Sequence, residues 1–169
     1  SRNALLRRAQ QALDGRLAVI SGRSIADLDR ILEGGIACVS GLHGLERRSS
    51  NGIVERVDAP PGLAHERAGI DALARAWPGV LVEDKGLSLA VHYRGAPEAE
   101  AAVRGLSLRG AAEFGLIEQH GKMVAELRAP GPHKGDSVAA FLMEPLFSGR
   151  VPIFVGDDLT DEHAFDAVA

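Results

Sequence analysis

The sequence predicts an α/β protein in which a parallel-sheet domain is interrupted by a smaller α+β domain. Three observations lead to this prediction. Short apolar strands alternate with helices in the first third of the chain, the middle shows strands with one polar face, and a late apolar run ends in carboxylates. We expect a first core segment at residues 1–60, an inserted domain at 61–128 and a second core segment at 129–169.

The first core segment is expected to form helix, strand, helix and strand. Residues 3–14 carry leucines at helical spacing, and a glycine follows at position 15. The run LAVIS at 17–21 is typical of a fully buried strand, and Ser24 is placed to cap the next helix. A second buried strand is expected at 36–40. Two apolar strands joined by a helix predict parallel pairing.

The inserted domain is expected to be an antiparallel sheet backed by two helices. One helix begins near residue 61 and stops at Pro78, and the other spans 97–107. The stretches VLVEDKG and SLAVHYR are expected to be two strands separated by a turn around Gly86, and two further strands are joined at Gly121. Residues 87–94 alternate between Leu87, Leu89, Val91 and Tyr93 and the set Ser88, Ala90, His92 and Arg94. This alternation predicts a sheet with one buried and one polar face. A helix at 134–147 and a strand in VPIFVGD then return to the parallel pattern.

Composition excludes several classes of function. A net charge of −4 and a pI near 5.9 provide no field that would attract nucleic acid. No stretch approaches the roughly 20 apolar residues that span a bilayer, so we expect no membrane partner. The one cysteine, Cys38, lies in an apolar run and fits a reducing, cytoplasmic compartment. The six histidines lack zinc-like spacing. We expect a monomer.

Four carboxylates lie within six positions directly after the last apolar run: Asp157, Asp158, Asp161 and Glu162. Crowded negative charge at the end of a strand indicates a bound cation, because the carboxylates repel one another without it. The alternative is a solvated turn that caps the next helix. Ligands of open parallel sheets bind at the carboxyl ends of strands, where Ser21 also lies. With Lys134, these groups suit a phosphate held together with Mg²⁺.

Several motifs resemble one known family. GDDLTDE after an apolar strand, HKG upstream of it and ISGR after an early strand are similar to late signature motifs of the haloacid dehalogenase superfamily. GLHGLERR, VEDKGLSLAVHYR and VAELRAPGPHKG further resemble the trehalose-6-phosphate phosphatases within it. The resemblance covers nearly the whole chain. It implies a Rossmann-like core with an inserted α+β cap domain, and hydrolysis of trehalose 6-phosphate with Mg²⁺ as the cofactor.

The resemblance also implies roles for individual residues. Ser21 and Lys134 would hold the phosphate, Asp157 would bind Mg²⁺, and Asp158 and Asp161 would support it directly or from a second layer. In the cap, the sugar-binding residues would be Glu83, Lys85 and Glu126. A surface salt bridge among these three is the alternative. His43 and Arg23 are further candidates for substrate binding.

One part of the family's machinery is not found in this sequence. The family uses an aspartate nucleophile and a second aspartate as general acid and base, both in a D-x-D-G-T stretch, which does not occur here. We expect the chain to be an inactive, marginally stable piece of a longer enzyme. The alternatives are a phosphatase for another sugar phosphate, and a non-catalytic module associated with a trehalose-phosphate synthase.

Overall fold

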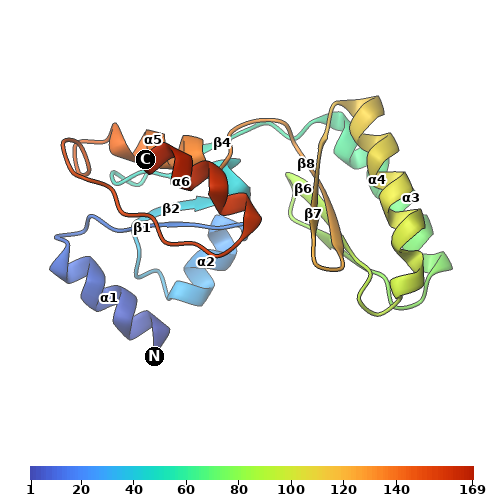
Figure 1. Ribbon diagram of the computed structural model, residues 1–169, viewed down its shortest axis with the longest axis horizontal. Helices are drawn as coiled ribbons and strands as arrows, with labels where there is room; N and C mark the ends of the chain where they lie inside the picture. The colour runs from blue at the N-terminus through green and yellow to red at the C-terminus, as the bar shows by residue number, and fades with distance from the viewer. The chain divides into compact units, whose positions relative to one another are not determined.

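The computed structural model describes residues 1–169, and the chain folds as two units (Figure 1). The first unit is discontinuous and contains Ser1–Arg56 and Gly131–Ala169. The second contains Val57–Pro130. A mixed α/β unit is therefore interrupted by a separate α+β unit, as the fold class predicted from the sequence requires.

The sheet of the first unit has the order β1-β2-β3-β4. Its first two strands, β1 (Ala18–Ile20) and β2 (Cys38–Gly41), pair in parallel, as the sequence predicts. The other two, β3 (Glu46–Arg48) and β4 (Val54–Arg56), are antiparallel additions that the sequence did not reveal. Both are three residues long and mostly charged, so they carry no apolar pattern that predicts a strand.

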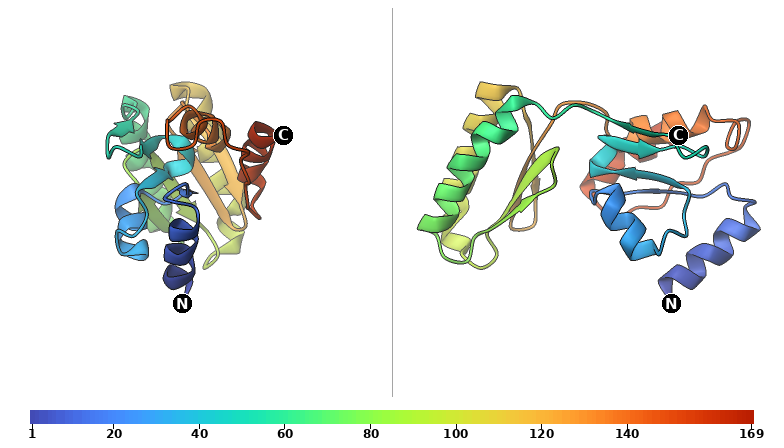
Figure 2. Two further views of the ribbon diagram at one scale, coloured as in Figure 1. Left: turned by 90° about the vertical axis from the view of Figure 1, so that its left-hand side faces the viewer. Right: turned by 180° about the vertical axis from the view of Figure 1, so that it is seen from behind.

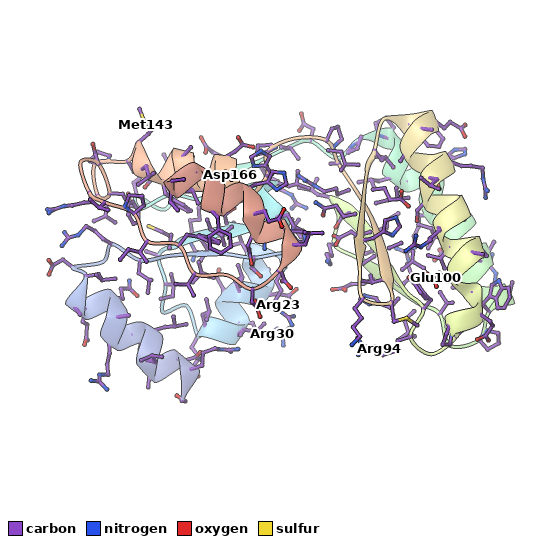
Figure 3. The ribbon with its side chains drawn as sticks, viewed as in Figure 1. Arg23, Arg30, Arg94, Glu100, Met143 and Asp166 are labelled. Carbon is purple, nitrogen blue, oxygen red and sulfur yellow. The ribbon has the colours of Figure 1, made fainter.

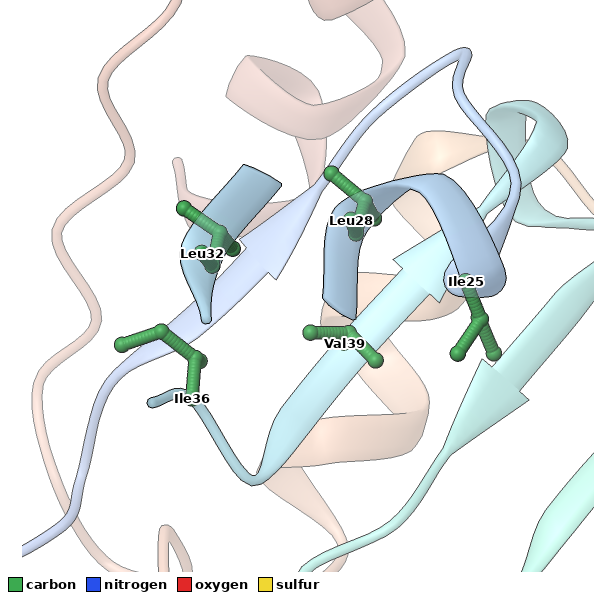
Figure 4. Packing of buried hydrophobic residues seen from close by; sticks show 5 residues of the cluster. All are labelled: Ile25, Leu28, Leu32, Ile36 and Val39. Atoms are coloured by element: carbon green, nitrogen blue, oxygen red, sulfur yellow. The ribbon is translucent and has the colours of Figure 1, made fainter. Parts of the chain in front are cut away.

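Four helices belong to this unit: α1 (Arg2–Ala12), α2 (Ile25–Leu32), α5 (Lys134–Leu142) and α6 (Glu162–Val168). Helix α2 packs on β2 and β3, whereas α5 contacts β1 and α6. The apolar face of α2 meets the β2 segment in a small core (Figure 4), which consists of Ile25, Leu28, Leu32, Ile36 and Val39. Burial of this face, rather than helix propensity, stabilises so short a helix.

Three predictions for this unit are wrong. Helix α5 ends at Leu142 instead of 147, because Pro145 cannot continue a helix. Strand β1 is half-buried instead of fully buried, because it pairs with β2 only and forms an edge of the sheet. The expected strand at 151–157 is not formed, and the side chains of Val151, Ile153 and Val155 are about nine-tenths exposed. An apolar run becomes a strand only when another strand satisfies its backbone N–H and C=O groups, and no strand of the sheet pairs with it.

The second unit contains two helices and one antiparallel sheet. The helices are α3 (Pro61–Ala76) and α4 (Glu100–Phe114), and the order of the sheet is β5-β6-β8-β7. Its strands are β5 (Leu81–Asp84), β6 (Ser88–His92), β7 (Ile117–Gly121) and β8 (Val124–Arg128). Helix α4 continues to Phe114 instead of ending at 107, and Gly115 stops it in the left-handed conformation.

The two helices cover one face of this sheet and leave the other without a helix (Figure 2). Helix α3 contacts β5 and β6, and α4 contacts β7 and β8. Leu89, Val91 and Leu127 are almost fully buried, and the residues next to them along their strands are polar except for Ala90. The apolar face is therefore buried as predicted, but the residues of the other face on the two central strands are buried as well, Ser88, Ala90 and Glu126 among them. None of the helices in either unit is both long and apolar enough to cross a membrane.

The core around α2 gives a first testable prediction. Replacing Leu28, which is 4% exposed, with alanine leaves a cavity under the helix. We expect Leu28→Ala to lower the free energy of unfolding by about 2–4 kcal/mol in urea titrations. Leu5→Ala is the matched control, because Leu5 is 67% exposed, and it should change that free energy by less than about 0.5 kcal/mol. Equal effects of the two substitutions would contradict this packing.

Candidate functional site

A buried ion pair forms the centre of the candidate site in the first unit. Lys134 is the first residue of α5, and its Nζ lies 2.6 Å from Oδ1 of Asp161. Both side chains are less than a tenth exposed. Asp161 ends the short 3₁₀ helix Leu159–Asp161, directly before α6. The pair therefore joins the start of one helix to the start of another.

The second oxygen of Asp161 shapes the acidic loop. Oδ2 accepts hydrogen bonds from the backbone N–H groups of Asp157 at 3.0 Å and Asp158 at 2.9 Å. Asp158 in turn caps the 3₁₀ helix, in a reciprocal capping box with Asp161. Both oxygens of Asp161 are thus engaged within the protein, and the loop is held by a side chain that is itself fixed by Lys134.

The pKa of Asp161 reflects these contacts. Burial by itself would raise the pKa, because it disfavours the charged carboxylate. The hydrogen bond and the charge of Lys134, with the two backbone N–H donors, outweigh burial and hold the pKa of Asp161 below its ordinary value. The carboxylate consequently stays ionised at neutral pH.

Three carboxylates gather where a cation can bind. One oxygen from each of Asp157, Asp158 and Asp161 lies within 4.8 Å of the others. Asp157 and Asp158 are exposed, whereas Asp161 is buried and already bonded. Carboxylate oxygens suit a hard cation such as Mg²⁺, which keeps several waters and needs only one or two protein carboxylates. Asp157 and Asp158 are the residues of this set with oxygens open to an ion.

Ser21, Arg23 and His43 lie in two loops that are bonded to each other. The backbone N–H of His43 donates to the carbonyl of Ser21 at 3.0 Å, and Ser21 Oγ accepts from the N–H of Arg23 at 3.2 Å. The imidazole of His43 lies over Gly22, where an added Cβ would be 2.4 Å from Nε2. The side chain of Arg23 is exposed (Figure 3). The structure therefore groups these three predicted residues.

The loop that carries His43 also lies against the start of α5. Gly44 has φ of +115°, and a Cβ there would lie 2.6 Å from the carbonyl oxygen of His133. Both the backbone angle and the lack of space require glycine. Because Lys134 follows His133 directly, the loops that hold Ser21 and Lys134 are neighbours in the first unit.

His133 and Glu46 are two structural residues whose positions the sequence did not settle. His133 forms a capping box with Asp136, and its ring lies 4.5 Å from the ring of His163. Histidine is not among the usual N-cap residues, so the sequence carried no clear signal for this cap. Glu46 is buried, and its Oε1 accepts from the N–H of Ile25 at 2.6 Å, which anchors α2.

The remaining candidates lie in the second unit. Glu126 on β8 accepts from Lys85 Nζ at 3.1 Å and from Ser88 Oγ at 2.5 Å. Glu83 on β5 contacts Nε2 of His92 at 3.2 Å and makes no ion pair with Lys85. Lys85 and Glu126 are largely buried, with side chains 15% and 11% exposed. The salt bridge expected as the alternative therefore forms between Lys85 and Glu126 only, and it is largely shielded from solvent.

One D-x-D sequence does occur in the chain, and it does not resemble a catalytic strand. Asp27 and Asp29 belong to helix α2. Asp27 pairs with Arg30, and Asp29 forms two 2.8 Å hydrogen bonds with Arg48. Asp27 thus stabilises the helix internally, whereas Asp29 links the helix to strand β3.

Comparison with solved structures defines the class of protein. A haloacid dehalogenase superfamily phosphatase from Bacteroides thetaiotaomicron matches with a TM-score of 0.53 at 19% identity, a likeness of fold alone, over 84% of this chain and 64% of that one. The crystal structure of a trehalose-6-phosphate phosphatase related protein matches with a TM-score of 0.77 at 26% identity. The match covers 99% of this chain and 72% of the chain in that crystal structure. The fold is that of the haloacid dehalogenase superfamily.

The sequence comparisons identify the family within this class. The trehalose-phosphatase family profile matches residues 4–169. The trehalose-6-phosphate phosphatase of Escherichia coli K12 is 40% identical over 159 residues, which are 93% of this chain and 60% of the relative. This chain belongs to the trehalose-phosphatase family. It spans about three-fifths of the length of the curated relatives it matches first.

The buried pair gives a second prediction, on the pH dependence of stability. A carboxyl whose folded pKa is lowered stabilises the fold at pH values above its unfolded pKa of about 3.9, and this contribution is lost as the pH falls through the folded pKa. We expect Asp161→Asn to lower the free energy of unfolding by about 3–5 kcal/mol at pH 7, because it leaves Lys134 buried without its anion.

The difference between the two proteins should become smaller as the pH is lowered from 5 towards 2. Urea titrations at several pH values, with a chelator present, measure it. Asp166→Asn is the matched control, because Asp166 is exposed on α6 (Figure 3). A difference that stays constant down to pH 2 would show that the Asp161 charge does not stabilise the fold.

Proposed function

We propose that this chain is part of a Mg²⁺-dependent phosphatase that hydrolyses trehalose 6-phosphate to trehalose and phosphate. The observation that carries the proposal is the buried Lys134–Asp161 pair beside two exposed carboxylates. A phosphate monoester carries close to two negative charges at neutral pH. The ammonium of Lys134 and a metal ion held by Asp157 and Asp158 would both attract it. The family and the names of the relatives support trehalose 6-phosphate as the particular substrate.

The residues of the first unit would bind and orient the phosphate. An ammonium has three N–H donors, and Asp161 occupies one of them, so Lys134 can donate to a phosphate oxygen without losing its partner. The hydroxyl of Ser21 is a second donor. Asp157 and Asp158 would hold the metal, and Asp161 would position both of them and Lys134 instead of binding the ion itself.

When bound, Mg²⁺ would neutralise part of the phosphate's charge and fix its orientation. In the second unit, Glu83, Lys85 and Glu126 would hydrogen-bond sugar hydroxyls. A sugar hydroxyl both donates and accepts, and a carboxylate beside an ammonium provides the complementary groups. This second unit would be the cap domain, with residues 61–128 as its extent, and the flanking residues 1–60 and 129–169 would form the core.

We further propose that the nucleophile of the family's D-x-D-G-T motif comes from a part of the parent polypeptide outside these residues. Two features support this. Strand β1 is paired on one side only, and the apolar side chains of Val151, Ile153 and Val155 are exposed. A further strand would give both segments a backbone partner. The chain of 169 residues alone should then be inactive.

The first test of the proposal measures phosphate release. We expect the parent polypeptide to release phosphate from trehalose 6-phosphate in the presence of Mg²⁺, with much slower release from sucrose 6-phosphate and glucose 6-phosphate. Asp157→Asn should lower activity by about 100-fold, because it weakens the metal site. Asp166→Asn is the control with the same chemical change outside the site, and its activity should equal that of the wild type.

The same assay separates the remaining outcomes. Activity of the 169-residue chain alone would refute the proposal that its nucleophile lies elsewhere. Binding of trehalose 6-phosphate by the parent without release of phosphate would favour a non-catalytic module. Faster release from another sugar phosphate would keep the chemistry and replace the substrate.

A further inference from the structure

We propose that Gln119 contacts the sugar and sets a preference for a disaccharide phosphate over a monosaccharide phosphate. This inference rests on the proposed function, in which the open face of the second sheet binds the sugar. Gln119 lies on β7, the edge strand farthest from β5 in the order β5-β6-β8-β7. Nothing in its sequence context, GLIEQHG, marked it as a candidate.

The strand register places Gln119 in line with the predicted sugar-binding residues. Glu83 pairs with Ala90, Ala90 with Glu126, and Glu126 with Gln119. Residues directly opposite each other on neighbouring strands point to the same face of a sheet. The row adjacent to it along the strands points to the opposite face and consists of Val82, Val91, Ala125 and His120. Gln119 therefore shares a face with Glu83 and Glu126.

The length of this row favours two sugar rings over one. Neighbouring strands lie about 4.8 Å apart, so three strand steps from Glu83 to Gln119 span about 14 Å. A single hexose is far shorter than this row, whereas two linked rings approach its length. Lys85 and Ser88 bond Glu126 near the middle of the row, and Arg128, two residues along β8 from Glu126, lies on the same face diagonally from Gln119. If one sugar ring binds at Glu126, the second ring of a disaccharide lies next to Gln119.

The side chain of Gln119 has an unused acceptor. Its Oε1 is buried, and no hydrogen bond reaches it. By contrast, Glu126 accepts from two side chains and Glu83 contacts His92. Buried polar atoms are nearly always paired, so an unpaired carbonyl oxygen is open to a hydrogen bond from water or from a ligand. A hydroxyl of a bound sugar would be such a donor once the Gln119 side chain turns to expose this oxygen.

The test uses the parent polypeptide and two neutral sugars, trehalose and glucose. Titrations followed by NMR report the side-chain amide signals of Gln119 and the Kd of each sugar. We expect trehalose, and not glucose, to shift the Gln119 amide signals in a saturable way. Gln119→Leu should raise the Kd for trehalose by about tenfold and change the Kd for glucose by less than twofold.

Two further variants separate this inference from the proposed function. His120→Ala, on the opposite face of the same strand, should leave both Kd values unchanged, and Lys85→Ala should raise both. Suppose that Lys85→Ala weakens binding, whereas Gln119→Leu changes neither Kd or changes both equally. The role of Gln119 is then refuted, but the sugar-binding face is supported. If wild-type protein binds neither sugar, or Lys85→Ala has no effect, the sugar-binding face and the inference fall together.

Discussion

The ion pair between Lys134 and Asp161 is the interaction on which the first unit's site depends. Removing two charges from water is costly, and the cost is offset only when the two groups lie close together and the remaining carboxylate oxygen also has hydrogen-bond partners. Asp161 meets this condition with one oxygen on Lys134 and the other on two backbone N–H groups. As a result, the buried Asp161 side chain fixes the backbone that carries the exposed carboxylates of Asp157 and Asp158.

The same principle explains the parts of the first unit that lie around this pair. Gly44 lets the loop of His43 approach the backbone of His133, and the cap formed by His133 fixes the first turn of α5. Glu46 performs a similar role for α2 by accepting from Ile25. The contacts of Gly44 and Glu46 each link two segments that are distant in sequence, so the site depends on contacts between elements as well as on the elements themselves.

The second unit obeys a simpler constraint, the two-residue period of a strand. One face of its sheet is filled by apolar side chains, and this fixes the register, because a shift by one residue would expose them all. The register in turn places Glu83, Glu126 and Gln119 in one row on the other face. Polar residues far apart in the chain are thus aligned by the packing of residues that never touch the proposed ligand.

Individual residues show which elements of the fold could be predicted from the sequence. The helices around Leu28 and Ile70 and the strands around Leu89 and Leu127 were predictable, because burial imposes their apolar period. The run VPIFV has the same composition as a buried strand, but composition does not provide a pairing partner. Strands β3 and β4 have pairing partners but no apolar pattern, so the sequence did not predict two strands that the structure contains.

The sequence by itself determined the class of fold, the family, and the residue types available for phosphate and cation binding, since these depend on local periodicity and on motifs of consecutive residues. Only the tertiary structure decided that Asp161 bonds Lys134 and that Gln119 aligns with Glu126. It also showed that Glu83 lies beside His92 instead of forming an ion pair with Lys85. The physical reason is that hydrogen bonds act over about 3 Å, and distant segments come that close only through folding.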